Sequence, residues 1–283
     1  MTTIGILHPG QMGVTVGAAA TAEASVLWAG DNRSPASTER AAAAGLRDVG
    51  TVADVCREAD IVVSVCPPAA ARDVAGAVAA CGFAGTYVDA NAVSPATSMA
   101  VGQVLQDGGG GCRFVDGGII GPPARTPGTT RMYLAGPGAG DLATLWDGSA
   151  LDVRSLGESA DGAAASALKM AFAGWTKGQS ALLLAVHALA SDAGVLDRLR
   201  EEWEISQPGL VARADAVAAG VSPKAWRFSG EMQEIADTMD SAGVPDGFHR
   251  AAATLYERMA AFKDRPGATI DEVIDAINRT AGD

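Results

Sequence analysis

The sequence predicts an α/β domain with a mostly parallel sheet, followed by an all-α domain that a long helix joins to it. Up to residue 157, short β-rich runs alternate with Ala-rich helical stretches, the pattern of a parallel sheet covered on both faces. From about residue 158 the strand signal disappears and every segment has helical character. We therefore expect two domains, residues 1–157 and 158–283, each of ordinary size.

The strands and helices follow each other in a regular order. In the first domain we expect strands at Ile4–Leu7, Ser25–Ala29, Ile61–Cys66, Thr86–Ala90, Arg113–Asp116, Arg131–Ala135 and Leu151–Ser155. Between them we expect helices at Met12–Thr21, Ala36–Ala44, Val52–Glu58, Ala69–Cys81 and Pro95–Gln106. In the second domain, turn signals separate helices over 160–192, 196–204, 208–219, 223–242, 246–264 and 269–280. The first of these is long and carries few charges, which indicates burial in the domain core or against a partner subunit.

Composition excludes several classes of protein. Hydrophobic residues make up 48% of the chain and charged residues 19%, too apolar for a disordered chain. The net charge of −12 makes nucleic acid an improbable partner, because an acidic surface repels phosphate backbones. Four cysteines without a CxxC pair and three histidines predict no metal site and fit a reducing compartment. The longest apolar run, near Ala181–Ala190, is about half of what a membrane span needs, so we expect a cytoplasmic protein.

The first strand is followed by a degraded glycine fingerprint. Residues 4–17 read IGILHPGQMGVTVG, in which His8, Gly10 and Gly13 occupy the positions of G-x-G-x-x-G. The motif follows a strand and opens a helix, the context of a Rossmann domain that binds a dinucleotide pyrophosphate at the helix N-terminus. We expect the cofactor to lie against five consecutive residues, His8, Pro9, Gly10, Gln11 and Met12.

The end of the second strand indicates which nucleotide is bound. Asp31 could accept a hydrogen bond from the ribose 2′-hydroxyl of NAD. Arg33, with Asn32 and Ser34 beside it, could instead clamp the 2′-phosphate of NADP. We favour NADP over NAD.

These motifs, in order along almost the whole chain, resemble the β-hydroxyacid dehydrogenase family, which includes 3-hydroxyisobutyrate and 6-phosphogluconate dehydrogenases. HPGQMG is similar to the family's GLGxMG, and the run Asn32-Arg33-Ser34 to that of its NADP-using members. EMQEIADTM at 231–239 is similar to a less-characterised branch of NAD(P)-dependent oxidoreductases.

The resemblance also implies site residues. Further cofactor contacts would come from Cys66, Pro67 and Pro68, which fall where the family has its Leu-Pro loop, and from Asn91. The substrate loop would be formed by Asp116, Gly117, Gly118 and Ile119, whose glycines leave backbone N–H groups uncovered. Lys169 falls where the family has its catalytic lysine, in the segment SALKMAFAG.

The chain departs from the family at several positions. Ala163 and Ala165 replace the helix glycines, and Ala173 replaces the asparagine that contacts substrate beside the lysine. Lys177 shares a helix face with Lys169 and Ala173, so two lysines could hold an anionic substrate. We list Ala173 and Lys177 with the predicted substrate contacts.

The sequence thus predicts an NADPH-dependent oxidoreductase that transfers a hydride between nicotinamide and a small hydroxy or oxo compound. Among such compounds we favour a β-hydroxy acid as the substrate. Lys169 would be the acid/base, since an apolar surrounding disfavours its charged form. An imine reductase on the same fold and a non-catalytic NADP-binding module in a protein assembly are the alternatives. The apolar helical domain would bind substrate and form a homodimer.

Overall fold

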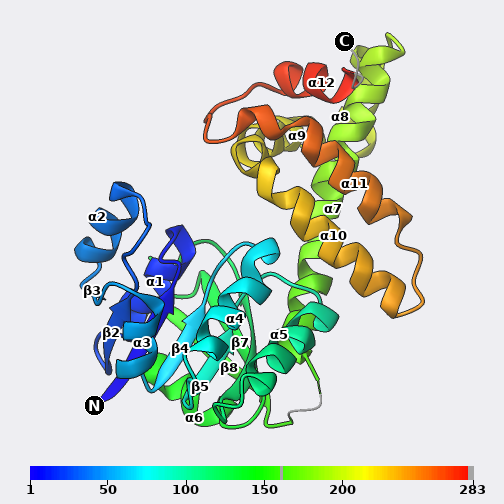
Figure 1. The fold of residues 1–283 in the computed structure, drawn as a ribbon. Coiled ribbons are helices and arrows are strands. Elements are labelled where there is room, and N and C mark those ends of the chain that lie inside the picture. Colours follow the sequence, from blue (N-terminus) through cyan, green and yellow to red (C-terminus); the bar gives the residue numbers. More distant parts are fainter. Residues whose placement is uncertain (160–161, 280–283) are drawn as a thin grey trace. The chain divides into compact units, whose positions relative to one another are not determined.

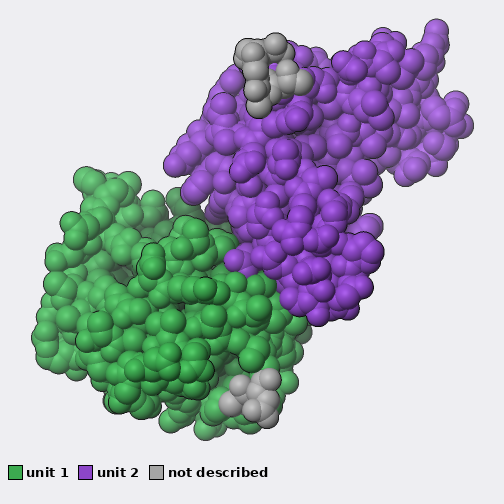
Figure 2. Space-filling view, turned by 45° about the vertical axis from the view of Figure 1, so that its right-hand side comes forward, with its two compact units in different colours: residues 1–170 green, residues 171–283 purple. Residues whose placement is uncertain are grey.

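The computed structural model describes residues 1–159 and 162–279, and it divides into two compact units, residues 1–170 and 171–283 (Figures 1 and 2). Residues 158–170 thus belong to the first unit, and Lys169 with them. In the described part of the chain, no helix has both the length and the hydropathy that a bilayer crossing requires.

Unit 1 contains an eight-stranded sheet in the order β3-β2-β1-β4-β5-β6-β7-β8. Among these described strands only the pair β6–β7 is antiparallel, so the predicted fold class is confirmed. The strands are β1 (Thr2–Leu7), β2 (Ala24–Trp28), β3 (Arg47–Asp48), β4 (Ile61–Ser64), β5 (Thr86–Asp89), β6 (Arg113–Ile120), β7 (Thr130–Ala135) and β8 (Leu151–Gly157).

Three helices of unit 1 begin at residues whose side chains cap them. Ser34, Thr51 and Ser94 each accept a hydrogen bond from a first-turn N–H group, and proline follows Ser34 and Ser94 directly. The helices are α1 (Gln11–Ala20), α2 (Pro35–Ala43), α3 (Val52–Glu58), α4 (Ala71–Ala80), α5 (Pro95–Asp107) and α6 (Ala139–Ala143).

Two strands differ from the sequence-based expectation. β3 is a two-residue strand of exposed, charged residues, which carry no hydrophobic signal, yet it pairs with Leu27 and Trp28. β6 continues through Gly117 and Gly118 to Ile120, where we expected a glycine-rich loop. These strand positions are occupied by glycine because neighbouring backbone approaches them too closely for a side chain.

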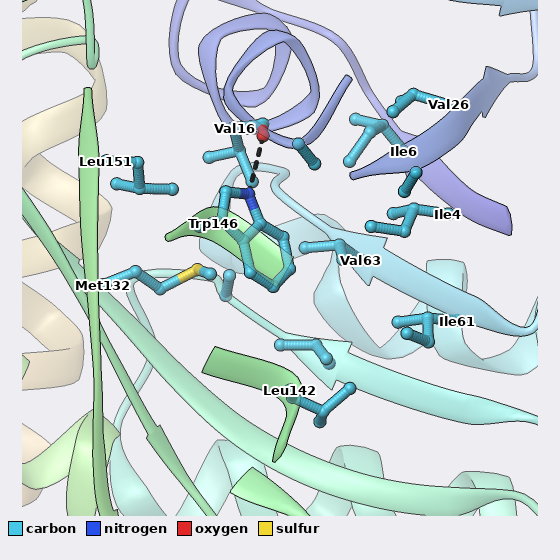
Figure 3. Close-up of a cluster of buried hydrophobic side chains, with 14 of the residues drawn as sticks. Ile4, Ile6, Val16, Val26, Ile61, Val63, Met132, Leu142, Trp146 and Leu151 are labelled. Carbon is cyan, nitrogen blue, oxygen red and sulfur yellow. Dashed lines mark hydrogen bonds between the residues drawn. The ribbon is translucent and has the colours of Figure 1, made fainter. Parts of the chain in front are cut away.

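The core of unit 1 holds the fingerprint helix in place. Trp146 is buried against aliphatic side chains of several strands, and its indole Nε1 donates a hydrogen bond of 3.0 Å to the carbonyl of Val16 in α1 (Figure 3). The residues joined by this bond are 130 positions apart. Trp146 therefore fixes α1, and with it the turn that precedes α1, to the segment between β7 and β8.

Unit 2 is helical. Helix α7 (Ala164–Asp192) crosses the division between the units, and α10 packs along α11 (Figure 1). The further helices are α8 (Leu196–Ser206), α9 (Leu210–Val221), α10 (Ala225–Ser241), α11 (Gly247–Arg258) and α12 (Ile270–Asn278).

Replacing Trp146 by Phe should lower the free energy of unfolding of unit 1 by about 1–3 kcal/mol, because one buried hydrogen bond and part of the buried ring are lost. Urea denaturation followed by far-UV circular dichroism measures the change. Trp226→Phe is the control, since Trp226 is 40% exposed, and it should change stability by less than about 0.5 kcal/mol. Equal effects of the two substitutions would contradict the role given to Trp146.

Candidate active site

The carboxyl ends of β1, β4 and β5 lie in one row across the sheet, and Asp116 in the middle of β6 continues that row. Leu7 pairs with Ser64, Ser64 with Asp89, and Asp89 with Asp116. The segments that follow these residues therefore reach the same edge of the sheet. The strand order also reverses between β1 and β4, and ligands of such open sheets bind at that point.

The turn between β1 and α1 is compact on one side and open on the other. A Cβ atom on Gly13 would lie 2.6 Å from the carbonyl oxygen of His8, so only glycine allows α1 to pack against this turn. At Gly10, by contrast, a Cβ atom would meet nothing nearer than 4.0 Å. The N-terminus of α1 has no side-chain cap and no acidic residue in its first turn. Its free N–H groups fit a pyrophosphate.

His8 replaces the first glycine of the fingerprint and keeps the backbone conformation that glycine favours, with φ of +66°. Its Nε2 lies 2.8 Å from a guanidinium nitrogen of Arg33. Burial, together with the positive charge of Arg33, lowers the pKa of His8 from 6.5 to about 4. The ring is therefore neutral near pH 7, and Nε2 accepts a hydrogen bond from Arg33. Arg40 of α2 donates a bond of 3.2 Å to the carbonyl of Pro9, which follows.

The loop after β2 brings Arg33 to the fingerprint turn. Asn32 has a left-handed conformation, with φ of +59°, which asparagine tolerates better than most residues. Ser34 caps α2, and its hydroxyl lies 3.1 Å from that of Ser37. A guanidinium, two hydroxyls and a helix N-terminus thus belong to one short segment, the donor set that suits a phosphate.

Asn91 holds the loop that follows β4. It is 2% exposed, and its side-chain oxygen accepts a bond of 2.6 Å from the N–H of Cys66. Its amide nitrogen donates to Ser64 and Asp89. Asn91 thereby sets the path of the segment Cys66-Pro67-Pro68, of which Pro67 is exposed. Burial raises the pKa of the Cys66 thiol to about 11, so this sulfur is not a nucleophile near neutrality.

Asp116 joins three elements of unit 1. It is 1% exposed, and it accepts bonds from the hydroxyl of Ser98 at 2.8 Å and from the backbone and hydroxyl of Ser166 at 2.9 and 2.6 Å. Burial raises the pKa of Asp116, while the bonds from Ser166 and Ser98 lower it. The geometry therefore gives Asp116 the role of fixing the first turn of α7 to β6.

Lys169 lies one turn further along α7. Its Nζ donates a bond of 2.8 Å to the carbonyl of Ile119 in β6. The helix can approach the strand because residue 118 is glycine: a Cβ atom there would lie 2.6 Å from the carbonyl oxygen of Ala165 and 3.2 Å from Cβ of Lys169. A Cβ atom on Gly117 would similarly lie 2.9 Å from the carbonyl oxygen of Asp89.

The cation of Lys169 and the fingerprint turn share one edge of the sheet. β6 is three strands away from β1, which corresponds to roughly 14 Å at the usual strand spacing. The structure thus brings together the predicted cofactor residues and Lys169 within unit 1. Their roles as ligands stay predictions.

Two predicted substrate contacts lie in unit 2. Ala173 is buried, and Lys177 pairs with Glu231 and packs on the ring of Phe228, 4.8 Å from its centre. Tyr256 donates a bond of 2.7 Å to the carbonyl of Lys177. These contacts give Lys177 a packing role, and its binding of substrate stays a prediction.

Other contacts at the edge were missed in the sequence. The hydroxyl of Thr15 in α1 accepts a bond of 3.0 Å from the N–H of Ala124 and donates to the carbonyl of Met12. The guanidinium of Arg125, which is exposed, lies 3.3 Å from the side-chain oxygen of Gln11. The segment after β6 is therefore attached to the first turn of α1. No local motif marks such pairs, since the partners are more than 100 residues apart.

Comparison with protein families places a domain in the second half of the chain. Residues 190–259 match the domain of unknown function DUF1932. An uncharacterized 28.5 kDa protein of Methanothermus fervidus is 32% identical over 151 residues, which make up 53% of this chain and 56% of that protein. The match thus spans about half the length of this curated relative.

Solved structures establish the fold. The chain superposes on a 3-hydroxyisobutyrate dehydrogenase from Mycobacterium tuberculosis, with L-serine, at a TM-score of 0.69 and 18% identity, covering 99% of this chain and 100% of the other. It also superposes on a reductive aminase from Aspergillus terreus, in complex with NADPH and ethyl levulinate, at a TM-score of 0.54 and 18% identity, covering 97% and 99%. The predicted resemblance is thus confirmed at the level of the fold: residues 190–259 match DUF1932, and the chain has the same fold as a 3-hydroxyisobutyrate dehydrogenase.

Proposed function

We propose that the protein is an NAD(P)-dependent oxidoreductase, with NADPH as the preferred cofactor and Lys169 as the acid/base. The observation that carries the proposal is the position of Lys169, whose ammonium group is held on Ile119 at the sheet edge where the uncapped N-terminus of α1 begins. Fold likeness to a dehydrogenase and to a reductase supports it.

The residues present fit a dinucleotide. The amides that open α1 would bind the pyrophosphate, and the close approach at Gly13 leaves no side chain in the way. Arg33, which lies beside the turn, is the cation for a 2′-phosphate. Its permanent charge and planar donors favour NADPH over NADH.

Hydride transfer to or from the substrate carbon would be supplied by the nicotinamide when it is bound. Lys169 handles the proton that accompanies it. In the direction of reduction, the Nζ ammonium donates a proton to the carbonyl oxygen as negative charge develops there. In the direction of oxidation, the neutral amine accepts the hydroxyl proton. The carbonyl of Ile119 orients Nζ for both steps, and Asp116 holds the helix turn from which the side chain extends.

We infer a small hydroxy or oxo compound as the substrate, and a β-hydroxy acid as the first class to test. The likeness to a 3-hydroxyisobutyrate dehydrogenase supports this choice. Two cations, the exposed Arg125 and the half-buried Lys169, suit an anionic substrate. Imine reduction is the second candidate, favoured by the likeness to a reductive aminase and by Ala173 in place of asparagine. A non-catalytic NADP-binding module remains the outcome if no substrate is turned over.

Calorimetric titration of the purified protein should show binding of NADPH at least about tenfold tighter than binding of NADH, because only NADPH carries a 2′-phosphate for Arg33 to bind. Binding of neither nucleotide would refute the proposed function. Tighter binding of NADH would overturn the choice of cofactor while leaving the reaction class intact.

Replacing Lys169 by Met should reduce turnover about 100-fold or more and leave the dissociation constant of NADPH unchanged, since only the proton transfer is lost. Turnover is followed at 340 nm with panels of β-hydroxy acids, the corresponding oxo acids and cyclic imines. Lys224→Met, which changes an exposed lysine of unit 2, is the control and should retain full activity. Unchanged turnover in Lys169→Met would remove this residue from the mechanism.

We also propose that the protein is a homodimer formed through α7. Phe172, Trp175, Leu182 and Leu189 are between 44% and 70% exposed, large values for side chains of this size. With Gln179 and Val186 they follow each other at alternating spacings of three and four residues, the pattern of paired helices. A cleft of about 570 Å³ adjoins this stripe. A second copy presents the same stripe, so one face can pair with itself about a two-fold axis.

The double variant Trp175→Glu/Leu182→Glu should be monomeric, because two carboxylates would lie in the apolar interface. Light scattering after size-exclusion chromatography gives the mass. Ile205→Glu, an exposed apolar residue of α8 outside the stripe, should leave the dimer intact. A monomeric native protein, or a dimer that tolerates both stripe substitutions, would exclude this interface.

A further inference from the structure

His8 occupies a backbone conformation that its side chain makes costly. A left-handed φ of +66° is strained for a non-glycine residue, and the proline that follows disfavours the helical conformation of residue 8 as well. Glycine at this position would be free of that strain. The backbone alone does not require histidine here, so the presence of histidine must be explained by its imidazole side chain.

The imidazole contacts the residue expected to recognise the 2′-phosphate. Its Nε2 lies 2.8 Å from Nη2 of Arg33, across 25 residues of sequence. The low pKa of His8 keeps the ring neutral near pH 7, so the contact is a hydrogen bond rather than a repulsion between two cations. A neutral ring that accepts at Nε2 carries its proton on Nδ1.

The pair leaves two buried donors without partners. Nε of Arg33 and Nδ1 of His8 are both buried and make no hydrogen bond within the described chain. Buried N–H groups without an acceptor are costly, so their presence at one place indicates that an acceptor arrives with a ligand. A phosphate, which has only acceptor oxygens at its charged end, has the matching chemistry.

The surrounding bonds fix the geometry of the pair. Arg40 donates to the carbonyl of Pro9, so α2 and the His8-Pro9 turn are joined at a second point. An arginine side chain loses much rotamer entropy when it is ordered. If the protein orders Arg33 before the nucleotide arrives, the nucleotide binds more tightly.

We propose that His8 determines the choice of nucleotide by holding the Arg33 guanidinium in the orientation that receives the 2′-phosphate. The proposal rests on the proposed function, because it presumes that the fingerprint turn binds a dinucleotide. It assigns His8 a positioning role that the glycine of the usual fingerprint cannot have.

The test compares the wild type with His8→Gly, His8→Gln, Arg33→Ala and the double variant His8→Gly/Arg33→Ala. Dissociation constants are measured by calorimetry for NADPH, NADH, 2′,5′-ADP and ADP, so that no substrate is needed. Glycine accepts the left-handed conformation, so His8→Gly is expected to fold, and its melting temperature checks this. Arg47→Ala, at an exposed ion pair with Glu58, is the matched arginine control.

His8→Gly should weaken binding of NADPH and 2′,5′-ADP about tenfold and leave binding of NADH and ADP unchanged. His8→Gln, whose side-chain oxygen can accept from Arg33, should recover part of the loss. In the double variant the histidine substitution should add nothing to the effect of Arg33→Ala, because both act through one group.

An unchanged ratio of NADPH to NADH affinity in His8→Gly would overturn the proposal, and so would an equal loss for all four nucleotides, which would indicate a role in the turn alone. Independent, additive effects of the two substitutions would also overturn it. These results leave the proposed function standing, whereas a wild type that binds no nucleotide refutes both.

Discussion

The buried carboxylate of Asp116 is the contact on which the candidate site depends. It accepts hydrogen bonds from α5 and from the first turn of α7, and it continues the row formed by the last residues of β1, β4 and β5. A carboxylate is costly to bury, and three donors compensate for that cost. The position of Lys169 follows, because one turn of helix separates it from Ser166. Glycine at position 118 then lets this turn lie against β6.

Much of the fold can be predicted from the sequence, because its strands are runs of buried aliphatic residues between clear helix caps. Strands such as β1 and β5 lie within two residues of their expected bounds. β3 could not be predicted, since two exposed charged residues contain no apolar pattern. The glycines of β6 indicated a loop, but they belong to the strand, and glycine is needed there because the backbone of Asp89 and Ala165 lies against them. Since Asp89 and Ala165 are distant in sequence, this packing could not be predicted.

The candidate site was predictable as a set of positions and less so as a set of contacts. The order of motifs indicated the turn at Gly10 and the lysine of α7. It did not show that Asn91 bonds to Cys66, or that His8 meets Arg33, because each pair depends on how two loops meet in space. The apolar character of α7 was visible in the sequence. Which stripe of α7 stays exposed depends on how the neighbouring helices cover it, and this was seen only in the structure.

The hydroxyl of Thr15 has a consequence for attempts to redesign the segment that follows β6. The hydroxyl accepts a hydrogen bond from the N–H of Ala124 and donates one to the carbonyl of Met12, so it is acceptor and donor at the same time. Valine, with nearly the same shape, could do neither. Libraries that vary the glycine- and proline-rich stretch after β6 therefore have a fixed end point. Insertions or deletions that move the amide of residue 124 would break its hydrogen bond to Thr15 and detach this stretch from the fingerprint helix.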